Sequence, residues 1–147
     1  MTPVECPLCA ADGGALVFQA DKYRVIRAEE AGFPAFYRVV WARHVAEFSD
    51  LSPGDRALCM AVVNVVETAL REHVQPTKIN LAALGNMVPH VHWHVIARFA
   101  WDTHFPLPVW CVAQRPVDAV ALAAVDAKLA VVDQAIRGGL SALAPTS

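Results

Sequence analysis

Pro89-His90-Val91-His92-Trp93-His94-Val95-Ile96-Ala97-Arg98-Phe99 alternates histidine with large apolar residues before an apolar exit. A period of two is typical of a β-strand, because successive side chains point to opposite faces of the sheet. The pattern predicts a strand that carries His90, His92 and His94 in a row on one face. The opposite face is expected to pack into a core through Val91, Trp93 and Val95.

The three imidazoles on one face predict chemistry at this strand. Unpaired imidazoles are poor core residues, so we expect the histidine face to meet a ligand, a metal or other histidines. One alternative is an exposed strand face whose histidines have no special role. Another is a metal site made by the row itself, since neutral imidazole is a common zinc ligand.

Length and composition indicate one domain over residues 1–147, large enough to bury a core without disulfides. The apolar fraction of 56% predicts apolar surface that is covered in an oligomer. A formal net charge of −2 argues against nucleic-acid binding. Charged residues interrupt the longest apolar stretches, so we expect no membrane span. The first residues lack a basic leader and an apolar run, which predicts a cytoplasmic protein.

Cys6-Pro7-Leu8-Cys9 places two thiols at a spacing that suits one metal ion or a redox pair. A zinc ribbon would need a second C-x-x-C, but Cys59 and Cys111 stand alone. Any further ligands would therefore have to be histidines. A metal site, a redox pair and no special role all remain open from the spacing.

The rest of the chain predicts an α+β fold with a meander of short strands. Strands are expected near 16–19, 23–27, 36–41 and 78–84, with His44 just after the third. Ser52 and Pro53 predict the start of a helix that runs to about His73. A second helix is expected over 117–137, ended by Gly138-Gly139, with 141–147 as a frayed tail. The segment 100–116 is expected to be irregular.

The turn before the histidine strand, Gly85-Asn86-Met87-Val88-Pro89, has a possible binding role. Glycine beside a short amide can aim backbone N–H groups and a carboxamide at an anion above the histidines. An ordinary hairpin turn is the alternative.

The sequence His90-Val91-His92-Trp93-His94-Val95-Ile96 resembles the histidine triad of the HIT family of nucleotide hydrolases and transferases. Pro34 to His44 is similar to the family's strand that ends in a basic residue and histidine. Asn80 and Gly85-Asn86 resemble the segment before its triad. The resemblance covers roughly residues 6 to 99.

The resemblance implies a HIT-like meander of about five strands, with one helix packed across it and a C-terminal helix. It also implies a homodimer and nucleotidyl transfer. The match to the middle histidine implies that His92 is the nucleophile, with His94 near the same phosphate. The match implies that the substrate-binding residues are Asn80, Gly85, Asn86 and Met87.

The C-x-x-C near the start resembles the zinc-containing branch of the family. That branch implies a structural Zn²⁺ with Cys6, Cys9, His44 and His90 as its ligands. Residues 1–15 would then form a zinc-binding amino-terminal segment. Two sulfur and two nitrogen ligands complete a closed tetrahedral site.

The chain departs from the family pattern in several places. Asn86 is one methylene shorter than the usual glutamine, Trp41 replaces a common proline, and Met87 replaces a hydroxyl residue found in some members. The acidic ribose ligand of some relatives has no clear match in this sequence, and Glu29 and Glu30 are the candidates for it.

We therefore expect a hydrolase of dinucleoside polyphosphates or nucleoside phosphoramidates that acts through a covalent nucleotidyl-histidine. A metalloenzyme whose histidine row binds the metal is one alternative. A nucleotide-binding regulator without turnover is another.

Overall fold

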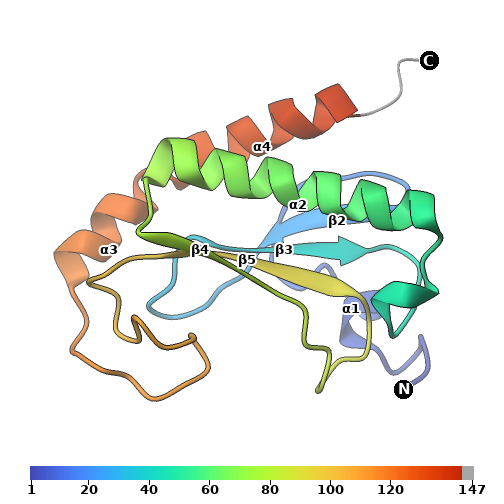
Figure 1. Cartoon of the computed structure of the whole chain (residues 1–147), viewed down its shortest axis with the longest axis horizontal. Helices are drawn as coiled ribbons and strands as arrows, with labels where there is room; N and C mark the ends of the chain where they lie inside the picture. The colour runs from blue at the N-terminus through green and yellow to red at the C-terminus, as the bar shows by residue number, and fades with distance from the viewer. Residues whose placement is uncertain (144–147) are drawn as a thin grey trace.

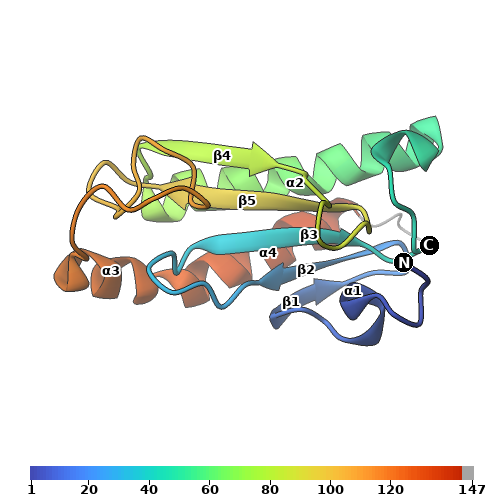
Figure 2. The ribbon, with the colours of Figure 1, turned by 90° about the horizontal axis from the view of Figure 1, so that it is seen from below.

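The computed structural model describes residues 1–143, which form a five-stranded antiparallel sheet in the order β1-β2-β3-β5-β4 (Figure 2). The strands are β1 (Ala15–Gln19), β2 (Tyr23–Arg27), β3 (Phe36–Trp41), β4 (Lys78–Ala82) and β5 (His92–Arg98). The short helix α1 (Pro7–Ala10) lies at the amino end. The predicted α+β meander is confirmed, and the histidine strand lies inside the sheet between β3 and β4.

Two long helices, α2 (Pro53–Val74) and α4 (Leu129–Leu143), cover one face of the sheet (Figure 1). The start of α2 is as predicted: the backbone N–H of Asp55 donates to the Ser52 hydroxyl at 3.1 Å, and Pro53 takes the first helical position. Between the sheet and the helices lies the main core, with Val25, Val39, Val95, Val62, Val66 and Ile136 among its buried residues. Within the described residues, no long helix packs on the opposite face.

The entry to β5 differs from the prediction, because the strand begins at His92 rather than before His90. His90 lies in the bend that follows Pro89, and its N–H donates to the Val88 carbonyl at 2.8 Å. A local bond of this kind turns the chain, so His90 leaves the regular alternation. The predicted apolar face holds: Val91 and Val95 are buried in the main core, and Trp93 packs against it.

The predicted single carboxy-terminal helix is wrong in two respects. It is divided into α3 (Ala119–Asp126) and α4, with a turn at residues 127–128. It also continues through Gly138 and Gly139 to Leu143, so residues 141–143 are helical and not a frayed tail. The rest of the predicted tail, 144–147, lies outside the described residues.

Gly139 does not end the helix. It lies where α4 packs so closely against α2 that there is no room for a side chain. A Cβ at this position would lie 2.7 Å from Cγ1 of Val65, whereas a Cβ at Gly138 would meet nothing within 4 Å. Residues 99–118 form neither helix nor strand, as predicted. Among residues 1–143, no helix is both long and apolar enough to cross a bilayer.

The contrast between the two glycines gives a stability prediction. Gly138→Ala should raise the free energy of unfolding by about 0.5–1 kcal/mol, because alanine is the better helix residue. Gly139→Ala should lower it, because valine is stiff in a helix and overpacking costs about 1–3 kcal/mol. Urea denaturation measures both. In a Val65→Ala background Gly139→Ala should become stabilising, and equal stabilisation by both glycine variants in the natural background would contradict this packing.

Candidate active site and metal centre

Cys6, Cys9, His44 and His90 lie together, with one donor atom from each within 4.8 Å of the others. The Sγ atoms of Cys6 and Cys9 lie 3.5 Å from Nδ1 of His90, and the Cys9 Sγ lies 3.4 Å from Nδ1 of His44. The two Nδ1 atoms are 3.2 Å apart. Residues from the start of α1, the loop after β3 and the bend before β5 thus converge on one point.

The imidazole of His90 is held in one tautomer. Its Nε2–H donates to the backbone carbonyl of Trp41 at 2.6 Å, since a carbonyl can only accept. The lone pair therefore lies on Nδ1, which faces the cysteines. Burial lowers the pKa of His90, which favours the neutral form that can bind a metal. The acceptor is the backbone carbonyl of residue 41, so the bond does not depend on the tryptophan side chain that replaces the family's common proline.

The cluster fits a tetrahedral zinc ion. Zn–N bonds of about 2.05 Å and Zn–S bonds of about 2.3 Å place neighbouring ligand atoms about 3.3 to 3.8 Å apart. Four of the six separations, Cys6–His90, Cys9–His90, Cys9–His44 and His44–His90, range from 3.2 to 3.5 Å, and all six lie within 4.8 Å. The bond from His90 to a backbone carbonyl is the kind of outer contact that orients metal-ligating histidines.

Arg24 on β2 holds the cysteine-bearing turn against the sheet. Its guanidinium donates to the carbonyls of Leu8 at 2.7 Å, Ala11 at 3.0 Å and Asp12 at 3.1 Å. Arg24 is buried, so the three carbonyls compensate the cost of removing its charge from water. No sequence pattern predicts this role, because the contact joins segments that only the fold brings together.

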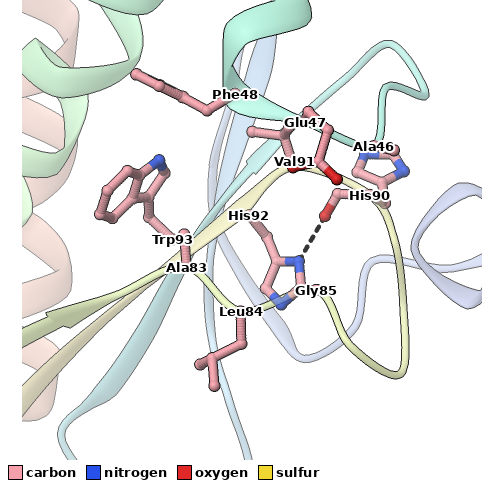
Figure 3. A pocket seen from close by; sticks show the side chains of 10 residues that line it. All are labelled: Ala46, Glu47, Phe48, Ala83, Leu84, Gly85, His90, Val91, His92 and Trp93. Carbon is pink, nitrogen blue, oxygen red and sulfur yellow. Dashed lines mark hydrogen bonds between the residues drawn. The ribbon is translucent and has the colours of Figure 1, made fainter.

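His92 is oriented by the backbone of His90. Its Nδ1–H donates to the His90 carbonyl at 2.6 Å, and Figure 3 shows the other ring nitrogen on the far side of the ring from this bond. Nε2 therefore carries the lone pair. Burial lowers the pKa of His92, and the nearby Arg38 adds to the effect, so the imidazole is neutral near pH 7.

His94 is buried beside His92, with ring centres 4.9 Å apart. Its Nδ1 accepts a hydrogen bond of 3.3 Å from Nε of Arg38, which lies opposite on β3. Burial lowers the pKa of His94 to about 3, with further contributions from His92 and Arg38. The ring of Trp110 lies 5.2 Å from that of His94.

A pocket of about 300 Å³ opens beside His92 and His94. The turn Gly85–Met87 lines it, and Met87 is 89% exposed. The other lining residues are Arg38, Leu84, Val88 and Trp110. A smaller hollow of about 80 Å³ lies on the other side of His92, against Glu47, Phe48 and Trp93 (Figure 3).

Asn80, also predicted to bind substrate, lines neither of these two pockets. Its Oδ1 accepts a hydrogen bond of 2.8 Å from Arg98. Arg98 also donates to Asp102 at 2.8 and 3.0 Å, and both residues are buried. Asp102 further accepts from the backbone N–H groups of Phe99, His104 and Phe105. This network fixes the start of the irregular segment that carries Trp110 to the pocket.

Sequence reasoning missed Arg38 and Trp110 as site residues. Arg38 is the third residue of β3, and its place opposite His94 follows from the register of β3 and β5. Trp110 arrives through an irregular segment, whose path no periodic pattern predicts.

A family model described as HIT domain matches residues 13–101, which is more than half of the chain. This chain belongs to the HIT domain family. The histidine triad is thus present as His90, His92 and His94, and membership supports a nucleotide-binding or hydrolase-type function in general. The matched range begins after Cys6 and Cys9. No curated protein is significantly similar in sequence.

Solved structures of histidine triad proteins share the fold. One from Bradyrhizobium japonicum is 29% identical with a TM-score of 0.69, over 87% of this chain and 91% of that chain. One from Sinorhizobium meliloti is 25% identical with a TM-score of 0.68, over 87% and 90%. A zinc-bound histidine triad family protein from Mycobacterium smegmatis is 21% identical with a TM-score of 0.60, over 91% and 99%.

Proposed function

We propose that this HIT domain protein hydrolyses nucleoside phosphate derivatives, either dinucleoside polyphosphates or nucleoside phosphoramidates, with His92 as nucleophile. The observation that carries the proposal is the 2.6 Å hydrogen bond from His92 Nδ1 to the His90 carbonyl. It fixes the proton on Nδ1 and leaves the lone pair of Nε2 free beside the pocket. A neutral imidazole with a free lone pair is a competent nucleophile.

The reaction has two steps. In the first, the Nε2 lone pair of His92 forms a bond to the α-phosphorus, and the bond to the leaving group breaks with its electron pair on that group. The His92 ring becomes cationic, and the His90 carbonyl stabilises it through the Nδ1–H. In the second step water attacks the phosphorus and loses one proton to solvent, while the Nε2–P bond breaks and returns its electron pair to His92. Two displacements divide one hard step into two easier ones.

Gly85, Asn86 and Met87 are the proposed substrate contacts, because they line the pocket beside His92. The backbone N–H groups of this turn and the Asn86 amide are donors suited to phosphate oxygens. Asn80 stays a prediction, since its Oδ1 already accepts from Arg98. His94 is proposed to donate a hydrogen bond from Nε2 to the substrate.

The proposed enzyme acts on small nucleotides in the cytoplasm and not on nucleic acids. All four cysteines are free, as is usual in a reducing compartment, and the net charge is −2. A metalloenzyme with the histidine row as ligands is less well supported, because Nδ1 of His92 donates to a carbonyl and Nδ1 of His90 faces the cysteines. The other alternative, a nucleotide-binding protein without turnover, is distinguished from the proposed hydrolase by the turnover measurement described next.

His92→Ala should abolish turnover of nucleotide substrates while binding stays nearly intact, because only the nucleophile is lost. The measurement is steady-state kinetics with a panel of AMP and GMP phosphoramidates and dinucleoside polyphosphates, together with mass spectrometry of protein quenched during turnover. The natural protein should carry an acid-labile nucleotidyl adduct on the peptide that contains His92.

His73→Ala, which changes a histidine on α2, is the matched control and should keep full activity. A His92→Ala variant that keeps more than about a tenth of the activity would rule out the covalent mechanism, since even an assisting group contributes about 10²-fold.

A structural zinc ion held by Cys6, Cys9, His44 and His90 is the second part of the proposal. The support is the convergence of four suitable donors and the fixed tautomer of His90. With four protein ligands the site would have no open position, so the ion would supply folding energy rather than act on substrate. It would tie the amino-terminal turn to the ends of β3 and β5.

Elemental analysis should find about one zinc per chain, and removal by a chelator should lower the melting temperature. Cys9→Ser should lose the metal, whereas Cys111→Ser should keep it, because Cys111 is an exposed cysteine outside the cluster. A protein that purifies without metal and melts at the same temperature with and without added zinc would contradict the site.

A homodimer is the third part of the proposal, and the edge strand β4 supports it. Among residues 1–143, only β5 pairs with β4, so the outer edge of β4 presents backbone groups outside the sheet's hydrogen bonding, a feature that promotes strand pairing between chains. Leu81 on this strand is 44% exposed, although it is a large apolar residue. Burial of such surface is favourable in an oligomer.

Light scattering at micromolar concentration should give the mass of two chains. Leu81→Glu should shift the protein toward one chain, because it places a charge at the proposed contact. Val120→Glu on α3, where the natural side chain is 83% exposed, should leave the mass unchanged. A single-chain mass for the natural protein would refute the dimer.

A further inference from the structure

Arg38 lies between Glu30 and His94 at the edge of the His92 pocket. Its Nε donates to Nδ1 of His94 at 3.3 Å, and its terminal nitrogen donates to Glu30 at 3.1 Å. Together the two bonds fix the orientation of the planar guanidinium group of Arg38. Strand pairing places Arg38 opposite His94, so this contact is built into the sheet.

The contact decides which nitrogen of His94 carries the proton. An arginine nitrogen is always protonated and can only donate, so Nδ1 of His94 must accept with its lone pair. The proton of the neutral ring is therefore on Nε2. Among the described residues Nε2 has no hydrogen-bond partner, and it is not one of the fully enclosed unpaired atoms, so it reaches the pocket.

A second proton on His94 is opposed from several sides. It would break the bond from Arg38 and place two cations in contact, in a residue that is 6% exposed. Burial, His92 and Arg38 lower the pKa of His94 to about 3. Glu30 is an acidic group in contact with this arrangement, and its carboxylate already accepts from Arg38. His94 is thus a hydrogen-bond donor that cannot act as an imidazolium acid near neutral pH.

This state of His94 matters for the group that departs when His92 attacks phosphorus. When a P–O bond breaks, the electron pair stays on oxygen, and a phosphate or anhydride anion is stable at neutral pH without a proton. When a P–N bond breaks, the electron pair stays on nitrogen, which must gain a proton as the amine departs. A neutral imidazole is a very weak acid, far from the pKa that suits proton donation near pH 7.

We propose that Arg38 is a positioning residue that holds His94 as a neutral Nε2–H donor and thereby selects leaving groups that depart as oxyanions over amines. The proposal rests on the proposed nucleotidyl transfer and chooses between its two substrate classes. It favours polyphosphates over phosphoramidates.

The test uses two substrates that differ in one atom: AMP joined to 4-nitrophenol through oxygen, and AMP joined to 4-nitroaniline through nitrogen. The ratio of their kcat/KM values is measured in the natural protein and in Arg38→Met, which has similar length but neither charge nor donor. The oxygen-to-nitrogen ratio should fall severalfold in Arg38→Met. The loss of the Arg38 charge and hydrogen bond lets His94 take a second proton more readily and assist the amine, although burial and His92 still oppose that proton. Comparison between variants cancels the intrinsic difference between the two bonds.

Arg71→Met on α2 is the matched control, and its ratio should equal that of the natural protein. Nitrogen-15 spectroscopy of the natural protein provides a readout independent of any variant: His94 should have a bare Nδ1 and a protonated Nε2. A proton on Nδ1, or an unchanged ratio in Arg38→Met, would overturn the inference while leaving the proposed function standing. Turnover of neither substrate, nor of any dinucleoside polyphosphate, by the natural protein would overturn the proposed function itself.

Discussion

The hydrogen bond from His92 Nδ1 to the His90 carbonyl is the interaction on which the site depends. It requires the His90 carbonyl to face the ring of His92, and therefore requires His90 to stand in a fixed bend. The side chain of the same residue belongs to the cysteine cluster and donates to Trp41. One residue thus serves both centres: its imidazole closes the proposed metal site, and its backbone sets the lone pair of the proposed nucleophile.

The division of the sheet into two faces makes room for this arrangement. The helices α2 and α4 bury one face, and a buried carboxylate on α4, Asp133, accepts from Tyr37 at 2.6 Å and from Arg27 at 3.2 Å. On the other face, Arg24 and Arg38 are neighbours of the histidines. Each has partners that compensate for lost hydration: Arg24 has three carbonyls, and Arg38 has Glu30 and His94. These charges cost desolvation energy, but they hold the cysteine turn and one histidine in place.

The sequence predicted the local features and not the long-range contacts. Alternation identified the histidine strand, and Ser52 with Pro53 identified the start of α2, because both signals act within one element. The prediction that His90 lies in the strand is wrong, since the bend after Pro89 depends on bonds from the His90 N–H to the Val88 carbonyl and from the Val91 N–H to the Val45 carbonyl. The prediction that Gly138-Gly139 ends the helix is also wrong, because α4 continues through both residues and only the contact with Val65 explains Gly139. Arg38 can be placed at the site only when the strand register is known, and Trp110 only when the path of the irregular segment is known. The convergence of Cys6, Cys9, His44 and His90 was expected from the family resemblance, not from spacing alone.

The stereochemical course at phosphorus tests the double displacement most directly. A dinucleoside polyphosphate with sulfur in place of one α-phosphate oxygen, as a single diastereomer, would be hydrolysed in ¹⁸O-labelled water, and the configuration of the product would be determined by phosphorus NMR. Each displacement inverts the configuration, so attack by His92 followed by attack by water predicts net retention. Net inversion would mean that water attacks the substrate directly, and it would contradict the role assigned to the lone pair of His92.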